Sequence, residues 1–214
     1  RFWAGVPNIP KKNNSKMAIY TCFIQHVINS LKETGKGAIV VPTGFITASS
    51  GIERKILEYI VDNKIVYGCV SMPSNVFANT GTNVSILFFD KSSTAEKVVL
   101  IDASNLGEDY KDSSNKQRRI IKDEDIEKII TTFYSGNDVK EFSVNKTYDE
   151  IKANNYSLSA GQYFDIEIEY VDITEDEFKE KMENYTNILN TLNKEKDNLN
   201  SIIINNLREL QYEK

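Results

Sequence analysis

The sequence predicts an α/β protein whose sheet ends in an antiparallel hairpin. A strand over Lys36–Pro42, a helix over Gly51–Asn63 and a strand over Ile65–Met72 follow one another as in a βαβ unit. Two of the predicted strands are nearly continuous apolar runs, which is typical of strands buried on both faces of a helix-flanked sheet. Pro73–Asn83 has no helical pattern and leads to a strand over Val84–Asp90, so we expect the last two strands to pair antiparallel.

The N-terminal part is predicted to be a loop followed by one helix. Gly, Pro and Asn residues mark Arg1–Ser15 as the loop. Lys16–Thr34 carries apolar residues at helical spacing, and Gly35 is expected to end this helix as its C-terminal cap. Ser50–Glu53 matches a capping box, which predicts the start of the next helix.

The region after the hairpin is predicted to be mixed. Val98–Asp102 is expected to extend the sheet at an edge, and the polar stretch Leu106–Arg119 is interpreted as a surface loop. Asp123–Ser135 is amphipathic and predicts a helix. Thr147–Glu150 matches a second capping box, which predicts a short helix. The Tyr-rich stretch Asn155–Val171 is interpreted as extended chain.

A long C-terminal helix is the last predicted element. Thr174–Glu177 is a third capping box, and a helix from there to Leu210 would be about 55 Å long. Apolar residues recur in alternating steps of four and three, interrupted by Lys196 and Asn206, which is the pattern of a coiled-coil seam. One narrow stripe on so long a helix requires a partner helix. The predicted interface residues are Phe178, Met182, Tyr185, Leu189, Leu192, Leu199, Ile203 and Leu210.

Composition bounds the possible functions. No apolar run approaches the roughly 20 residues that span a membrane. Cys22 and Cys69 form no metal-ligand or redox motif, and a lone His26 excludes a multi-histidine metal site. Residues 1–104 carry 11 Lys/Arg against 7 Asp/Glu, whereas residues 105–214 carry 15 against 24. The first half is therefore the better candidate for contact with DNA, although its lysines are as readily explained as solubilising residues.

Several segments in the correct order resemble one known family. FIQHVINSLKETGKGAIVVPTGFI, GIERKILEYIVDN and MPSNVFANTGTNVSILFFDK resemble the modification (M) subunit of type I restriction-modification systems. The opening RFWAGVP is similar to the segment that follows the catalytic motif of that family. The resemblance runs through Arg1–Ser104 and continues more weakly in Tyr156–Tyr163.

The resemblance implies a site-specific DNA adenine-N6 methyltransferase that uses S-adenosylmethionine in the cytoplasm. It implies DNA, a specificity (S) subunit and a restriction (R) subunit as partners, and no membrane. The family's Gly-rich cofactor loop and its Asn/Asp-Pro-Pro-aromatic motif do not occur in this sequence. We therefore expect the C-terminal part of a longer enzyme, which alone binds no cofactor and catalyses nothing.

The resemblance also refines the expected fold and domains. The chain would form the C-terminal half of a methyltransferase-type doubly wound sheet, then a helical region and a coiled-coil helix. The expected divisions are 1–104 for the catalytic-domain part, 105–172 for a connecting region and 173–214 for subunit interaction. The alternative is a non-enzymatic α/β interaction module that self-associates through its C-terminal helix.

Candidate site residues follow from the same resemblance. In related enzymes an aromatic residue after the last strand stacks on the flipped adenine, which makes Phe89 the first candidate for the target-base pocket. Core packing is the more usual role of a strand aromatic. Lys91 would then lie close enough to reach a phosphate, although a lone strand-end lysine is more often only solvated.

Two loops supply the remaining candidates. Asn79, Thr80, Thr82 and Asn83 lie in a loop that the resemblance places on the DNA-facing side, with ordinary turn chemistry as the alternative. Thr43 and Phe45 follow the carboxyl end of a strand, where ligands of open α/β sheets bind, and are further candidates for the base pocket. A purely structural strand exit is the alternative there.

Overall fold

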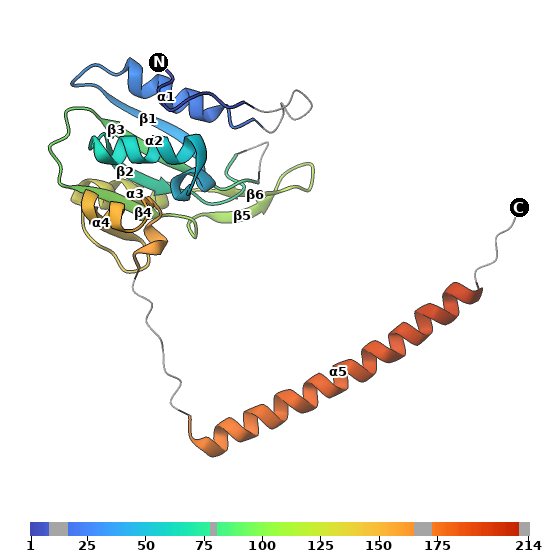
Figure 1. Cartoon of the computed structure of the whole chain (residues 1–214). Helices are drawn as coiled ribbons and strands as arrows, with labels where there is room; N and C mark the ends of the chain where they lie inside the picture. Colours follow the sequence, from blue (N-terminus) through green and yellow to red (C-terminus); the bar gives the residue numbers. More distant parts are fainter. Residues whose placement is uncertain (9–16, 78–80, 165–172, 210–214) are drawn as a thin grey trace, which may run out of the picture. The chain divides into compact units, whose positions relative to one another are not determined.

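The computed structural model describes residues 1–8, 17–77, 81–164 and 173–209 (Figure 1). The chain divides into two compact units, residues 1–165 and 166–214. The first unit, here called the sheet unit, contains every strand of the described residues, and the second contains one long helix. No helix among the described residues has the length and hydropathy needed to cross a membrane.

The sheet unit is built on a mixed five-stranded sheet. Its strand order is β1 (Lys36–Pro42), β3 (Val84–Asp90), β2 (Val66–Ser71), β4 (Lys97–Asp102) and β7 (Ser143–Thr147). β3 is antiparallel to both β1 and β2, β4 is parallel to β2, and β7 is antiparallel to β4. The predicted antiparallel pairing of β2 with β3 is confirmed.

Two features of the sheet differ from the simplest interpretation of the sequence. β1 and β2 run in the same direction but do not pair, because β3 lies between them. The expectation that Val98–Asp102 lies at an edge is wrong, since β7 pairs with the other side of β4. β7 comes from the stretch interpreted as a connecting region, so residues 105–172 contribute a strand to the sheet.

One face of the sheet is fully covered. α1 (Tyr20–Ser30), α2 (Gly51–Asp62) and α4 (Tyr148–Ala153) pack on it and form the main core with β2, β3 and β4. Leu87 and Leu100 have no exposed surface. At about 25 cal/mol per Å² of buried apolar area, this cluster is the main source of stability in the sheet unit.

The opposite face is only partly covered. α3 (Asp123–Ser135) packs over β2 and β4, and its Phe133 ring lies 4.8 Å from the Phe88 ring. No described element covers this face of β1, and Val40 is 46% exposed. β2 is therefore buried along nearly its whole length, as the apolar runs predicted, whereas β1 alternates between covered and exposed residues.

The first helix is shorter than predicted. α1 spans Tyr20–Ser30 rather than Lys16–Thr34, and Leu31 leaves the helix in an extended conformation. The extended backbone brings the Leu31 side chain against Gly37 of β1. Gly35 is therefore not the helix cap, and its N–H instead donates to the Lys32 carbonyl in a following turn.

The capping box expected at Ser50–Glu53 is not formed. Ser50 precedes α2, but its side chain makes no capping hydrogen bond. The chain enters the helix through Gly51 at φ +77°, and the Glu53 carboxylate accepts a hydrogen bond from the Tyr20 hydroxyl at 3.4 Å. Burial, with help from Glu53, raises the pKa of Tyr20 to about 12.

Two further segments differ from expectation. Leu106–Arg119, interpreted as a loop, forms all but the last residue of the two-stranded antiparallel sheet of β5 (Glu108–Lys111) and β6 (Gln117–Ile120). The described part of Asn155–Val171 forms no strand, and Ala160–Gln162 within it form a 3-10 turn, η3. The remainder of that prediction lies outside the described residues.

The C-terminal unit is one 35-residue helix, α5 (Glu175–Glu209). Its capping box is formed as predicted, with the Thr174 backbone N–H and hydroxyl donating to Glu177 at 2.9 and 3.0 Å. Every side chain from residue 175 to residue 208 is exposed. The second predicted capping box is also formed, at Thr147 and Glu150 before α4.

Candidate functional site at the carboxyl edge of the sheet

Three strands that run in the same direction end at one edge of the sheet. Pro42, Ser71 and Asp102 are the last residues of β1, β2 and β4, and the antiparallel β3 begins at the same edge with Val84. Ligands of open α/β sheets bind outside the carboxyl ends of such strands. This edge, here called the carboxyl edge, is therefore the candidate functional site.

A chain of hydroxyl groups crosses the carboxyl edge. Thr43 Oγ1 lies 3.1 Å from Ser85 Oγ, which in turn lies 3.4 Å from Ser71 Oγ. The Thr43 N–H donates to the Asn83 carbonyl at 3.0 Å, so the start of η2 (Thr43–Thr47) is tied to the start of β3. Ser85 is fully buried, whereas Thr43 is half-buried and lies where the chain reaches the surface.

The structure thus brings Thr43, Thr82 and Asn83 to the same edge. Thr82 and Asn83 are exposed just before β3. Asn79 and Thr80 lie outside the described residues. The serine hydroxyls of this chain were missed by sequence reasoning. The signal that could have found them is a polar residue at Ser85, near the start of an otherwise apolar strand.

Phe45 and Phe89 fill the core in this arrangement. Both side chains have no exposed surface, and the Phe45 ring meets Tyr20 edge-on at 6.1 Å. Neither ring offers a face to a base at the surface of the sheet unit. Phe88, the neighbour of Phe89, points to the opposite face of the sheet and packs against Phe133.

Phe89 and Lys91 also lie away from the carboxyl edge. β3 runs antiparallel to β1, so its end at Asp90 faces Lys36 at the beginning of β1. Seven strand residues separate the two ends of β3 by about 20 Å. The Lys91 ammonium donates to the Leu31 carbonyl at 2.9 Å at this opposite edge. The structure therefore separates these two candidates from Thr43, Thr82 and Asn83.

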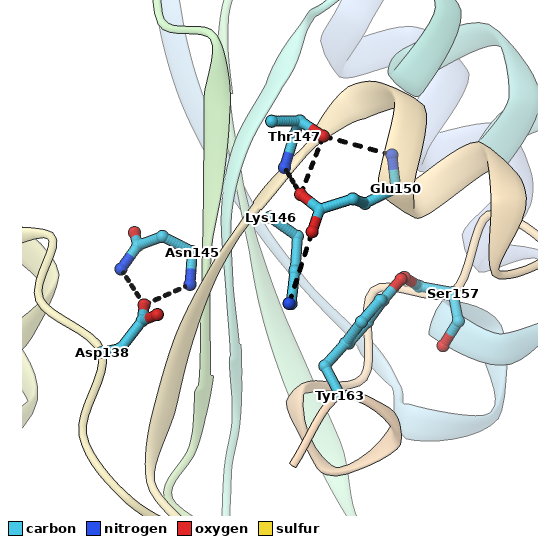
Figure 2. Close-up of polar contacts among 7 residues, drawn as sticks. All are labelled: Asp138, Asn145, Lys146, Thr147, Glu150, Ser157 and Tyr163. Atoms are coloured by element: carbon cyan, nitrogen blue, oxygen red, sulfur yellow. Dashed lines mark hydrogen bonds and ion pairs between the residues drawn. The ribbon is translucent and has the colours of Figure 1, made fainter. Parts of the chain in front are cut away.

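A loop from the YSLSAGQY segment covers part of the carboxyl edge. The Leu158 N–H donates to the Ile46 carbonyl at 3.0 Å, which fixes the loop to η2. An added Cβ at Gly161 would lie 3.7 Å from an Asp102 carboxylate oxygen, so η3 lies over the end of β4. The loop is in turn held by Tyr163, whose hydroxyl donates to the Ser157 carbonyl at 2.7 Å (Figure 2).

The anchoring of this loop extends to β7 and α4. Figure 2 shows Tyr163 beside Lys146, whose ammonium lies 5.6 Å from the centre of the tyrosine ring. Burial raises the pKa of Tyr163, so its hydroxyl stays protonated and can donate to Ser157 at neutral pH. Lys146 also reaches Glu150, which accepts from Thr147 in the capping box. The YSLSAGQY segment is therefore a structural support of the site.

The described residues contain no group of three or more His, Cys, Asp or Glu side chains arranged to hold a metal ion. The buried Cys69 thiol has a raised pKa because burial disfavours the thiolate, so it is unreactive. The arrangement at the carboxyl edge can thus donate and accept hydrogen bonds. Its described side chains include these hydroxyls and the partly exposed Asp102 carboxylate, which accepts the Ser104 N–H at 3.0 Å.

The predicted interface stripe on α5 is exposed along its described length. Phe178, Tyr185 and Leu189 are 53%, 62% and 63% exposed, and Leu210 lies outside the described residues. Sequence reasoning missed the apolar residues that flank the stripe, because only the alternating steps of four and three were followed. These are Ile188, Ile202, Ile204 and Leu207, all at least 46% exposed.

Comparison with known proteins agrees with this geometry. Residues 1–172 match the family model described as N-6 DNA Methylase. The chain is 34% identical over 205 residues to the type I restriction enzyme MjaIX methylase subunit of Methanocaldococcus jannaschii, covering 91% of this chain and 34% of that protein. It is 29% identical over 219 residues to the HindI methylase subunit of Haemophilus influenzae, covering 95% of this chain and 45% of that protein.

A solved structure supports the fold. The methyltransferase subunit of a type I restriction-modification system from Streptococcus thermophilus superposes with a TM-score of 0.62 at 24% identity, covering 76% of this chain and 36% of that one. The mixed sheet with its carboxyl edge therefore has the fold of a methyltransferase-like α/β domain. The chain belongs to the N-6 DNA methylase family, and the relatives it matches are methylase subunits of type I restriction enzymes. It spans about a third to under a half of their length.

Proposed function

We propose that this chain is the C-terminal part of a site-specific DNA adenine-N6 methyltransferase, the modification subunit of a type I restriction-modification system. The observation that carries the proposal is the position of β3. It lies antiparallel between two strands that run in one direction, which is the closing arrangement expected of a methyltransferase-type doubly wound sheet. The family match over residues 1–172 supports the chemistry.

The free edge of β1 supports a sheet that continues beyond this chain. Among the described residues β1 pairs only with β3, and its second face is partly bare at Val40. Sheet edges with long apolar strands are normally paired or covered. In the whole enzyme, further strands would pair with β1 and extend the sheet, and the carboxyl edge would be completed by their loops.

S-adenosylmethionine is the cofactor that the family implies for the whole enzyme. The residues of this chain do not fit it, because the sequence has no Gly-rich strand-to-helix loop and no Pro-Pro motif. The described side chains at its carboxyl edge are hydroxyls, the Asn83 amide and the Asp102 carboxylate. The chain alone would accordingly bind no cofactor and transfer no methyl group. Its share in the reaction would be to complete the base pocket with Thr43 and to contact DNA through the Asn79–Asn83 loop.

Phe45 and Phe89 would support this pocket from the core, since neither ring is exposed. Phe45 lies in η2 at the carboxyl edge, and Phe89 lies in β3. Lys91 would contact DNA only if the bound duplex also reached the opposite edge of the sheet. Thr43 is thus the stronger pocket candidate, and Phe89 the weaker.

The α5 helix would join the chain to its partners in the cytoplasm. The stripe from Phe178 to Leu210 would pack on helices of the specificity subunit, and the restriction subunit would join the assembled complex. A helix whose apolar stripe is exposed throughout its described length would gain most of its stability from packing on a partner. The division into 1–104, 105–172 and 173–214 remains our prediction for the functional parts.

Methyl transfer tests this proposal directly. The full-length subunit that contains this chain, assembled with its specificity subunit, should transfer labelled methyl groups to duplex DNA, and the label should appear as N6-methyladenine. The same duplex with N6-methyladenine already at the target should accept none. Label on cytosine, or transfer by the 214-residue chain alone, would contradict the assignment.

The exposed stripe of α5 also favours a second candidate, a non-enzymatic module that self-associates through this helix. Light scattering separates the two. The methylase proposal expects a monomer or weak aggregate that forms a defined complex when the specificity subunit is added. A stable homodimer that Leu189→Asn and Leu192→Asn disrupt, without any binding to a specificity subunit, would favour the module.

A further inference from the structure

The β5–β6 hairpin is held rigidly beside the carboxyl edge. It begins six residues after β4 ends, and it projects from the body of the sheet (Figure 1). The Arg119 N–H donates to the Asn75 carbonyl at 3.1 Å, and its guanidinium donates to the Ser104 carbonyl at 3.2 Å. Gly81 also lies near Asn75, since a Cβ added at Gly81 would be 3.0 Å from Asn75 Oδ1. The hairpin therefore stands next to the loop that enters β3.

The acidic residues of the hairpin are all paired with basic ones. Asp109 accepts from Arg119 at 2.7 Å, Asp112 accepts from Arg118 at 2.9 Å, and Glu108 pairs with Lys122. These contacts use three acids and three of the five basic residues between positions 106 and 122. The Arg119 contact holds the pKa of Asp109 below its ordinary value. The hairpin is therefore locally basic, although it lies in the acidic half of the chain.

The other two basic residues of this segment have no acidic partner among the described residues. Lys111 and Lys116 are exposed, and neither ammonium group makes an ion pair or hydrogen bond with any residue that the structure describes. They flank the turn that joins β5 to β6, so both lie at the tip of the hairpin. Because every acid near them is already paired, their charge is not cancelled locally.

The tip is also preorganised. One Asp112 oxygen accepts the N–H groups of Ser114 and Lys116 at 2.8 and 3.0 Å, and the other accepts from Arg118. The backbone bond from Lys116, together with those from Arg118 and Ser114, holds the pKa of Asp112 below its ordinary value. Asp112 therefore stays ionised and fixes the turn at neutral pH. A fixed turn loses little entropy when its lysines bind a ligand.

We propose that the β5–β6 hairpin binds the phosphate backbone of duplex DNA through Lys111 and Lys116. The inference rests on the proposed function. It places a DNA contact within residues 105–214, whose net negative charge made them the weaker candidate for contact with DNA. Uncancelled cations on a rigid projection suit a polyanion, because each phosphate contact releases condensed counterions. Backbone contacts of this kind fix the position of a duplex and carry no sequence information.

The test uses the assembled, full-length methylase. The variant Lys111→Gln/Lys116→Gln removes both tip cations. The matched control Lys32→Gln/Lys97→Gln removes the same charge from exposed lysines at the opposite edge, just before β1 and at the first residue of β4. Affinity for a fluorescent duplex is measured by anisotropy from 50 to 200 mM salt, with and without the recognition sequence. Thermal unfolding shows that both variants remain folded.

The tip variant should bind both duplexes about tenfold more weakly at 100 mM salt, and the magnitude of its salt slope should fall by about 2. The control variant should match the wild type within about twofold. An unchanged salt slope in the tip variant, or an equal loss in the control, would overturn the hairpin proposal even if methylation proceeds normally. A wild-type complex that binds DNA but does not methylate it would contradict the proposed function alone. A wild-type complex that binds no DNA would contradict both the proposed function and the hairpin proposal.

Discussion

Large apolar side chains are buried in the core of the sheet unit, whereas those on the α5 helix are exposed. In the sheet unit, Leu87, Phe89 and Leu100 are completely buried between the sheet and its helices. On α5, Leu189 and Leu192 are 63% and 57% exposed, although the helix is the longest element of the chain. The first region therefore has its own source of stability. The second has the geometry of a helix whose stabilising contacts come from another surface.

The largest expected difference between the two regions comes from one leucine in each. Leu87→Ala should lower the free energy of unfolding of the sheet unit by about 2–5 kcal/mol, because it leaves a cavity in a closed core. Leu192→Ala should change it by less than about 0.5 kcal/mol. Urea unfolding followed by the fluorescence of Trp3, which packs on Tyr59 with ring centres 3.9 Å apart, reports on the sheet unit. Comparable losses in the two variants would show that α5 is part of the same cooperative core.

Alanine substitutions at two glycines test how tightly α3 packs on the sheet. At Gly68 an added Cβ would lie 2.4 Å from two ring carbons of Phe133, whereas at Gly44 it would meet nothing within 4 Å. Gly68→Ala should therefore cost about 1–3 kcal/mol through overpacking, and Gly44→Ala should stay within about 0.5 kcal/mol of the wild type. The same urea titration measures both. A tolerated Gly68→Ala would mean that α3 is not firmly packed on the sheet.

Two capping boxes of the same geometry provide the next comparison. Thr147 and Glu150 precede α4 in the sheet unit, and Thr174 and Glu177 precede α5, with the backbone N–H bonds at 2.8 and 2.9 Å. Thr147→Ala should lower the unfolding free energy of the sheet unit by about 1 kcal/mol. Thr174→Ala should leave that value unchanged and reduce only the helical circular dichroism signal. A loss of sheet-unit stability in Thr174→Ala would show that the two regions unfold together.

The smallest effect is a dependence on pH. The Thr147 backbone N–H, and then its hydroxyl, hold the pKa of Glu150 below the ordinary 4.5, and Thr174 does the same for Glu177. A lowered pKa in the folded state stabilises that state above pH 4.5, and this contribution is lost as the pH falls through the lowered value. Acidification below about pH 4.5 should therefore weaken both caps, with no change between pH 7 and 5 from these groups.

Glutamine variants isolate the two carboxylates. Glu150→Gln should remove part of the acid sensitivity of Trp3 fluorescence, and Glu177→Gln should remove part of the acid sensitivity of the helical signal. If the fluorescence titration of Glu150→Gln coincided with that of the wild type, the cap would not contribute to the pH dependence of the sheet unit.

The sequence was informative where local chemistry decides the structure. Continuous apolar runs located β2 and β3, and the capping boxes at Thr147 and Thr174 marked two helix starts correctly. The same pattern failed at Ser50, because Gly51 enters the helix with a positive φ that moves the serine out of capping position. A short motif predicts contacts only when the flanking backbone allows them.

Features that depend on long-range contacts were not visible in the sequence. The β5–β6 hairpin is too polar and too short to show strand periodicity, and it is fixed by Arg119 contacts with Asn75 and Ser104. The strand order was likewise hidden, because nothing local shows that β3 inserts beside β1. The antiparallel direction of β3 beside β1 puts Lys91 and Thr43 at opposite edges of the sheet.

The bare side of β1 has a consequence for how this polypeptide behaves in isolation. Alternate residues of this seven-residue strand point their backbone groups away from β3, where they can recruit a strand from another molecule, which is a route to aggregation. Lys36 and Pro42, at the two ends of that strand, are residue types that discourage such pairing, but the apolar Ile39–Val41 segment between them does not. The 214-residue polypeptide produced by itself should therefore lose solubility as its concentration rises, and a charged substitution at Val40 should delay that loss.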